Sequence, residues 1–355
     1  MLTPTLAEPV SLVSMRIAQV APPWLAVPPA GYGGIEWVVA LLADGLVDRG
    51  HDVTLFATGD SETKAKLEFF FEKAPGSSHI NSPWHDVMHT LQVFREPDRF
   101  DLFHVHSPWS ALVAGVLSGH PVVHTVHGSF NDEMRMLYDE IADKAWFVAI
   151  SEAQRSTMPG LNYAGVVYNG IDVERYPLRE DKEDFLLFLG RAAPEKGVLP
   201  AVLTAKETGD RIVLALKIAR EDEIEHWRDD VKPVLPPGTE VLGEITLDEK
   251  LDLLSRAKAV LFPIDWDEPF GLVMTEAMAC GTPVIATPRG SVPEVIADGE
   301  TGFVVSVKDY PKEAAAALER LAEIDPNACR DRVRQLFSKE AMVEGYEAAF
   351  ERALA

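Results

Sequence analysis

The chain has 355 residues, enough for two domains that each bury a hydrophobic core. Its 56 aspartates and glutamates outnumber 33 lysines and arginines, giving a formal net charge of −23, which argues against a nucleic-acid partner. An anionic small-molecule ligand would therefore need basic residues concentrated in one cleft.

The first 14 residues carry Glu8 and no basic stretch, so we expect a disordered extension and not a signal peptide. No run reaches the ~18 apolar residues of a membrane-spanning helix. Of the two cysteines, Cys280 and Cys329, the first lies in an apolar run. This favours a buried free thiol and a reducing compartment, so we expect a cytoplasmic protein.

From Met15 onward, short apolar runs alternate with helical stretches. A glycine- and proline-rich loop follows the first run and opens an amphipathic helix that ends before Gly50. The apolar runs predict strands at residues 16–20, 52–56, 101–105, 121–125 and 146–150. Continuous apolar strands separated by helices indicate a parallel sheet covered on both faces.

The same pattern restarts after a polar segment at residues 172–184, which we interpret as a hinge. Strands are predicted at residues 185–189, 212–216, 240–242, 259–262 and 283–286, with helices at 199–208, 247–255 and 339–354. The fold class is therefore α/β, with two doubly wound Rossmann-like domains facing across a cleft. Ligands of such folds bind beyond the carboxyl ends of the strands.

The first chemical signal is a pair of glutamates, Glu268 and Glu276, around a predicted helix start at Gly271. The N-terminus of that helix is a natural diphosphate site because its N–H groups and its dipole both favour an anion. Two carboxylates suit a ligand with several hydroxyls. The alternative is that Glu268 is a charge at the helix N-terminus and Glu276 is a solvated helix residue.

The second signal is Arg191 and Lys196, which follow the first strand of the second domain. They supply the concentrated positive charge that an anionic ligand requires. No GxxxxGK[ST] motif is present, so a P-loop nucleotidase is unsupported. A third signal is Gly33 and Gly34 at the start of the first helix, where backbone N–H groups can meet a phosphate. Because Glu36 replaces the last glycine of GxGxxG, a dinucleotide site and a dehydrogenase are disfavoured.

Histidines gather in the first domain, at His104, His106, His120, His124 and His127. A zinc site would need further ligands at controlled spacing, so we expect no metal. His127 is followed by Gly128 where a strand gives way to a loop, and is the histidine placed to reach the cleft. We expect the other four to be core or loop residues.

An acidic triplet precedes Glu268. Asp265 and Asp267 flank Trp266 in a DxD arrangement, which in other folds binds a metal on a sugar-nucleotide diphosphate. Here we expect it to shape the loop.

Taken together, these residues resemble the retaining GT-B-type glycosyltransferases of family four. The likeness runs from about residue 15 to the C-terminus, and its most specific part is the spacing of Glu268 and Glu276. The resemblance implies an acceptor-side domain at 15–175, a nucleotide-sugar donor domain at 176–336, and a C-terminal helix at 337–355 that crosses back to the first domain.

The resemblance also implies roles for individual residues. Arg191 and Lys196 would neutralise the donor diphosphate, and Glu276 would hold the ribose hydroxyls. Glu268 would contact the donor sugar together with the backbone N–H groups of Phe270, Gly271 and Leu272. The residues implied to be catalytic are His127, Arg191, Lys196 and Glu268, and those implied to bind the donor are Gly33, Gly34, Arg191, Lys196, Glu268, Phe270, Gly271, Leu272 and Glu276.

By the same resemblance, a hexosyl unit would pass from a donor of the UDP-glucose or GDP-mannose type to a sugar, lipid-linked or small-molecule acceptor. Neither a metal nor a cofactor would be needed. Where many members carry a glycine-rich turn this chain has Lys217, which we hypothesise is a further cleft cation. Two alternatives stay open: a hydrolase or epimerase of nucleotide sugars, and a non-catalytic nucleotide-sugar-binding protein.

Overall fold

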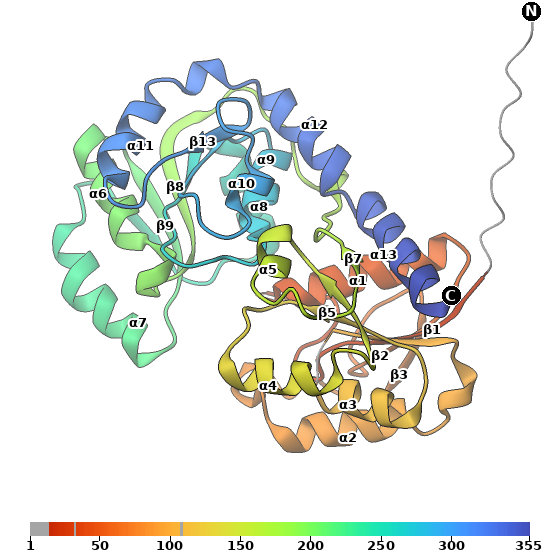
Figure 1. The fold of residues 1–355 in the computed structure, drawn as a ribbon. Helices are drawn as coiled ribbons and strands as arrows, with labels where there is room; N and C mark the ends of the chain where they lie inside the picture. Colours follow the sequence, from red (N-terminus) through yellow and green to blue (C-terminus); the bar gives the residue numbers. More distant parts are fainter. Residues whose placement is uncertain (1–13, 32, 107–108) are drawn as a thin grey trace, which may run out of the picture.

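The structure, a computed structural model, describes residues 14–31, 33–106 and 109–355. The predicted extension at residues 1–14 lies almost entirely outside the described residues. Two parallel sheets with helices on both faces form the molecule, as Figure 1 shows. The predicted α/β class with two doubly wound halves is therefore confirmed.

The N-terminal sheet has seven strands in the order β3-β2-β1-β4-β5-β6-β7, all parallel. Alternate strand residues point to opposite faces, so the sheet carries one apolar cluster on the side of α1 and another on the side of α3 and α4. Its elements are β1 (Arg16–Val20), α1 (Gly34–Asp48), β2 (Asp52–Ala57), β3 (Lys66–Phe69), α2 (Pro83–Val93), β4 (Leu102–Val105), α3 (Trp109–Ser118), β5 (Val122–Val126), α4 (Asp132–Ile141), β6 (Trp146–Ala149), α5 (Glu152–Ser156) and β7 (Tyr163–Val166).

The C-terminal sheet has six parallel strands in the order β10-β9-β8-β11-β12-β13 around one large apolar core. Its elements are β8 (Glu183–Arg191), α6 (Val198–Thr208), β9 (Ile212–Lys217), α7 (Glu221–His226), β10 (Glu240–Leu242), α8 (Leu247–Arg256), β11 (Ala257–Phe262), α9 (Leu272–Ala279), β12 (Val284–Ala286), α10 (Val292–Val295), β13 (Gly302–Val304), α11 (Tyr310–Leu318) and α12 (Pro326–Leu336).

The last helix, α13 (Lys339–Leu354), lies against the N-terminal sheet and not the C-terminal one. It packs beside α1 and β7 (Figure 1), and its buried Tyr346 and Phe350 belong to the apolar cluster on the α1 side. An extended residue, Ser338, separates α13 from α12. Its hydroxyl caps α13 by accepting from the Ala341 N–H. The chain therefore crosses from one sheet to the other at both residues 167–182 and residues 337–339.

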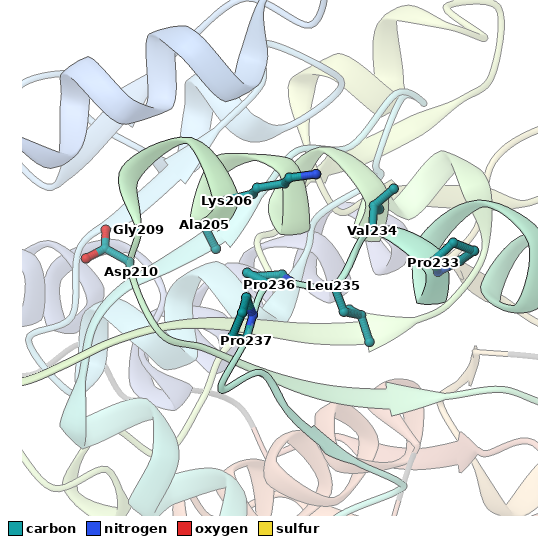
Figure 2. A pocket seen from close by; sticks show the side chains of 9 residues that line it. All are labelled: Ala205, Lys206, Gly209, Asp210, Pro233, Val234, Leu235, Pro236 and Pro237. Carbon is teal, nitrogen blue, oxygen red and sulfur yellow. The ribbon is translucent and has the colours of Figure 1, made fainter.

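A groove of about 390 Å³ opens between the C-terminal end of α6 and the segment at residues 233–237 (Figure 2). None of the residues predicted to bind a donor lines it. No helix among the described residues is long and apolar enough to cross a membrane.

Candidate functional site

Two loops meet at the carboxyl ends of the neighbouring strands β8 and β11. Lys196 follows β8 and Glu268 follows β11, and the Lys196 Nζ lies 2.6 Å from the Glu268 Oε2. The Asp265 N–H also donates to the Glu195 carbonyl at 2.8 Å, which ties the two loops together. The structure thus brings a predicted cation and a predicted carboxylate into one ion pair.

Two glycines allow this close approach. Gly197, at φ 81°, lies so near β11 that a Cβ would fall 2.0 Å from the Pro263 carbonyl oxygen. Gly290, at φ 53°, lies against the Glu268 backbone, where a Cβ would fall 2.2 Å from the carbonyl oxygen. Both positions need the left-handed region and have no room for a side chain. The loop around Glu268 is therefore fixed by backbone contacts on two sides.

Arg191 ends β8 and is held by a carboxylate that the sequence did not single out. Its Nε donates to the Glu223 Oε1 at 2.6 Å, and its Nη2 donates to the same oxygen. The other oxygen of Glu223 accepts the N–H groups of Ala219 and Arg220 at 2.9 and 3.1 Å. Burial by itself would raise the pKa of the Glu223 carboxyl, but these N–H groups and Arg191 together lower that pKa. The Glu223 side chain is fully buried, so it holds the guanidinium as a fixed anion.

Glu276 lies on α9 and is nearly buried, so the alternative of a solvated helix residue is wrong. Its Oε1 accepts the Lys250 ammonium at 2.6 Å and the Tyr176 hydroxyl at 3.1 Å. Lys250 comes from α8 and Tyr176 from the segment that joins the two domains. Neither was predicted, because each lies far from Glu276 in the sequence and no local pattern relates them.

The N-termini of two helices approach each other beside these loops. A Cβ on Gly34, at the start of α1, would lie 3.2 Å from the Leu272 side chain at the start of α9. The N–H groups of Phe270, Gly271 and Leu272 donate to no acceptor within the described part of the chain. Free N–H groups and the positive ends of two helix dipoles thus converge at the predicted phosphate position.

His127 follows β5 and is partly buried. Its Nε2 lies 2.8 Å from the Nδ1 of His106, a second histidine that follows β4. Burial lowers the pKa of His127 to about 3, so the ring is neutral at physiological pH. The expected core or loop positions of the other four histidines are confirmed. His104, His106 and His124 are buried, and His120 lies beside Asp98 in the loop between α3 and β5.

The structure also places the two cysteines, the acidic triplet and Lys217. Cys280 and Cys329 are both buried and free, and burial raises the pKa of each thiol to about 12, which disfavours a nucleophilic role. Asp265 pairs with Arg289 at 2.6 Å, in keeping with a loop-shaping role. Lys217 lies 3.2 Å from Glu244.

The sequence did not predict one contact between the domains, which Glu294 makes. Glu294, on α10, accepts the N–H groups of Glu152 and Ala153 at the start of α5, and also the Tyr168 hydroxyl. The sequence contained the signal in part, since Ser151 and the following residues read as a helix start. Nothing in a linear pattern could show that the capping carboxylate comes from about 140 residues away.

Comparisons with known proteins place this geometry in a family. The sequence profile described as glycosyl transferases group 1 matches residues 172–336, and that of glycosyltransferase family 4 matches residues 32–175. A phosphatidyl-myo-inositol mannosyltransferase of Mycolicibacterium smegmatis is 30% identical over 345 residues, covering 86% of this chain and 84% of that protein.

Two solved structures resemble the chain over nearly its whole length. AviGT4, a glycosyltransferase of avilamycin A biosynthesis, is 29% identical with a TM-score of 0.72, and the match covers 96% of this chain and 98% of AviGT4. Anabaena HepE in complex with UDP and glucose matches in fold, with 20% identity, a TM-score of 0.73, and coverage of 95% and 99%. The chain therefore belongs to the group 1 glycosyltransferases of GT-B fold, which use nucleotide-sugar donors.

Proposed function

We propose that this protein transfers a hexosyl unit, with retention of anomeric configuration and without a metal, from a donor of the UDP-glucose or GDP-mannose type. The observation that carries the proposal is that Arg191 and Lys196 lie at the end of β8 and just beyond it, while the free N–H groups at the start of α9 follow the neighbouring strand β11. These are groups that bind a diphosphate, and they lie beside two carboxylates that can accept hydroxyl groups.

Transfer breaks the bond from the anomeric carbon to the phosphate oxygen and leaves negative charge on the diphosphate. Fixed cations and helix-terminal N–H groups stabilise that charge more in the transition state than in the ground state. Loss of one such donor costs on the order of 100- to 1000-fold in kcat. We therefore expect Arg191→Ala or Lys196→Ala to lower kcat by that amount.

Retention is proposed to occur by attack of the acceptor on the same face from which the diphosphate leaves. The leaving phosphate oxygen takes the acceptor's proton, so no protein carboxylate has to form a bond to the sugar. Glu268 is already engaged by Lys196, which favours a binding role over a nucleophilic one. A Glu268→Gln variant should retain substantial kcat, and complete loss of turnover with normal donor affinity would favour the nucleophile.

The donor and the acceptor are open to direct measurement. UDP and glucose are bound by HepE, and a mannosyl donor is implied by the name of the mycobacterial relative, so both donor types support the proposal by analogy only. The acceptor would be a sugar, a lipid-linked sugar or a small molecule that binds on the side of the N-terminal domain.

A thermal-shift screen against UDP-, GDP- and ADP-sugars tests the donor assignment, because a ligand that binds the folded state raises the Tm. One donor should stabilise the wild type and fail to stabilise Arg191→Ala. The screen is repeated with EDTA, which should change neither the shift nor turnover. If no nucleotide sugar shifts the wild type, the donor site is wrongly assigned. Turnover of the donor at equal rate without any acceptor would indicate a hydrolase.

A further inference from the structure

A row of buried polar side chains leads from α13 through the N-terminal sheet to His127. It crosses the neighbouring strands β5, β4 and β1, which place Thr125, His104 and Gln19 side by side. The Tyr346 hydroxyl lies 3.0 Å from the Thr125 Oγ1, which lies 2.8 Å from the His104 Nε2. The His104 Nδ1 lies 3.1 Å from the Gln19 Oε1.

The row continues on the other side of Gln19. The Gln19 Nε2 lies 2.8 Å from the His106 Nε2, and the His106 Nδ1 lies 2.8 Å from the His127 Nε2. Burial keeps the pKa of all three histidines low, so each ring is neutral and has one N–H donor and one acceptor nitrogen. Every hydrogen bond in the row must therefore point the same way along it, in one of two directions that differ in which end of the Gln19 amide faces His104.

The Tyr346 hydroxyl decides the direction. Burial raises its pKa, so it keeps its proton, and Thr125 is its hydrogen-bond partner among the residues that the structure describes. If Thr125 donated to Tyr346, the buried Tyr346 proton would have no acceptor there, which is unfavourable. Tyr346 therefore donates to Thr125, and Thr125 donates to the His104 Nε2.

Each later donor in the row follows from the one before it. His104 donates from Nδ1 to the Gln19 oxygen, and the Gln19 amide donates to the His106 Nε2. His106 then donates from Nδ1 to the His127 Nε2. We infer that this hydrogen-bond row, anchored by Tyr346, holds His127 in the tautomer that carries its proton on Nδ1 and presents that N–H as a donor.

This inference rests on the proposed function for its consequence in catalysis. Because the Nε2 of His127 is occupied as an acceptor, His127 does not act as a general base through that atom. Its Nδ1–H instead donates to an oxygen of the donor sugar or phosphate, and Gln19, His104, His106, Thr125 and Tyr346 are positioning residues.

Nitrogen NMR of histidine-labelled wild-type protein tests the tautomer directly, whether or not the protein transfers sugar. A protonated ring nitrogen and an unprotonated one have well-separated shifts, and a His127→Gln variant identifies the signals of His127. The expected result is a protonated Nδ1 and an unprotonated Nε2. A protonated Nε2 on His127 in the wild type would overturn the inference.

A pair of variants tests the positioning role. Gln19→Leu breaks the row at its centre, so the His127 signals should move toward a mixture of tautomers and kcat should fall about tenfold, the loss expected for one misdirected hydrogen bond. The KM for the donor should change by less than about twofold, because the phosphate and ribose contacts remain.

Tyr138→Phe is the matched control. It removes the hydroxyl of a tyrosine that is buried as Tyr346 is. This hydroxyl contacts His124 at 3.0 Å, and both residues lie outside the row. It should alter neither the His127 signals nor kcat. The inference would be contradicted if the His127 signals stayed unchanged in Gln19→Leu, or if they moved equally in Tyr138→Phe. If the NMR result is as expected but the protein transfers no sugar, only the proposed function is contradicted.

Discussion

At the scale of single residues, the proposed donor site consists of charges that are already paired. Arg191 lies against Glu223, Lys196 against Glu268, and Lys250 against Glu276. The cation side chains are 21–27% exposed, so water screens these pairs less than it screens pairs at the surface. Each pair holds a long flexible side chain in place before a ligand arrives.

The Arg191 pair gives the first prediction. Glu223 uses the Nε and one Nη2 proton of Arg191, so three N–H donors stay available for phosphate oxygens. In Glu223→Gln the buried anion that fixes Arg191 is lost, and we expect the affinity for a nucleoside diphosphate to fall about tenfold, or about 1.4 kcal/mol. Isothermal titration with the nucleoside diphosphate and with the bare nucleoside measures this, and only the former should weaken.

Glu347→Gln serves as the control for that experiment. Glu347 is also buried and also binds an arginine, Arg49, at 2.6 Å, but it lies on α13. Its replacement should lower stability and leave nucleotide affinity unchanged. Tighter binding in Glu223→Gln would mean that Glu223 competes with the ligand for Arg191 and does not orient it.

The sequence identified Arg191, Lys196, Glu268 and Glu276 because each lies in a short motif at a strand end or helix start. It could not identify the partners of Arg191 and Glu276. Glu223 lies 32 residues from Arg191, and Lys250 lies 26 residues from Glu276. Such partners are set by strand order and by the packing of helices, which a linear pattern does not contain.

At the scale of elements, the central strands and the edge strand β10 were predictable, and the other three edge strands were not. Strands such as β1, β4 and β8 are continuous apolar runs because both faces are buried. The edge strand β3 carries Lys66 and Glu68 and has no buried residue, and β7 and β13 are short and contain glycine. Weak apolar patterning and short length left these three edges out of the prediction.

Helix α6 supplies the second prediction, because a left-handed glycine lies at each of its ends. Gly197 precedes it at φ 81° against the Pro263 carbonyl, and Gly209 follows it at φ 75°, where a Cβ would meet nothing within 4 Å. Gly197→Ala combines strain with overlap and should cost about 2–4 kcal/mol of unfolding free energy, whereas Gly209→Ala should cost about 1 kcal/mol.

Urea unfolding of both glycine variants measures the difference. Since Gly197 also fixes the loop that carries Lys196, donor affinity should fall in Gly197→Ala and not in Gly209→Ala. Equal losses of stability would show that the backbone beside Pro263 moves easily, and the loop would then be less rigid than the contacts imply.

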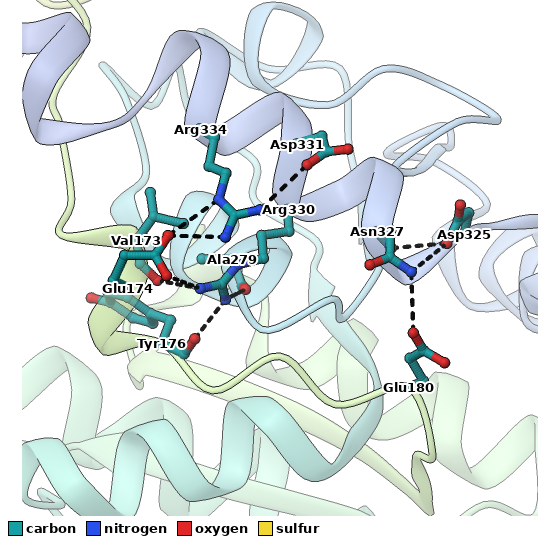
Figure 3. Close-up of polar contacts among 10 residues, drawn as sticks. All are labelled: Val173, Glu174, Tyr176, Glu180, Ala279, Asp325, Asn327, Arg330, Asp331 and Arg334. Atoms are coloured by element: carbon teal, nitrogen blue, oxygen red, sulfur yellow. Dashed lines mark hydrogen bonds and ion pairs between the residues drawn. The ribbon is translucent and has the colours of Figure 1, made fainter.

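At the scale of the whole molecule, one buried arginine joins three parts of the chain. Arg330, on α12, donates to the carbonyls of Tyr176 and Val173 in the segment between the domains and to that of Ala279 at the end of α9 (Figure 3). Its side chain is 6% exposed. The crossing segment is therefore fixed to the helix that carries Glu276.

The third prediction compares Arg330→Met with Arg334→Met. The first leaves the buried carbonyls of Tyr176 and Ala279 without a donor, while that of Val173 keeps the Tyr176 N–H, and it should cost about 3 kcal/mol of unfolding free energy. The second removes a half-exposed arginine on the next turn of α12, which pairs with Glu174, and should cost less than about 1 kcal/mol. Thermal and urea unfolding measure both, and similar effects of the two changes would mean that water replaces Arg330.

The fourth prediction concerns pH. Burial lowers the pKa of His89 and of His124 to about 4, and lowers those of His104 and His106 well below the usual value. The unfolded chain binds these protons near pH 6.5 while the folded chain does not. Stability is therefore complete above about pH 6.5 and should fall by several kcal/mol between about pH 6.5 and 5.

Urea midpoints at a series of pH values between 7.5 and 5 measure this loss. His89→Leu removes one of the proton sites and should make the dependence shallower by about one proton. A stability that does not change over this range would show that the buried histidines accept protons in the folded state.

The position of α13 has a consequence for the order in which the chain can fold during synthesis. Tyr346 and Phe350 fill the core of the N-terminal sheet, yet they are translated after the whole C-terminal domain. While the ribosome is still making residues 176–338, the face of the N-terminal sheet that carries α1 is missing the second helix that covers it. The half of the protein that is made first is thus completed last, and until then its apolar surface is open to chaperones.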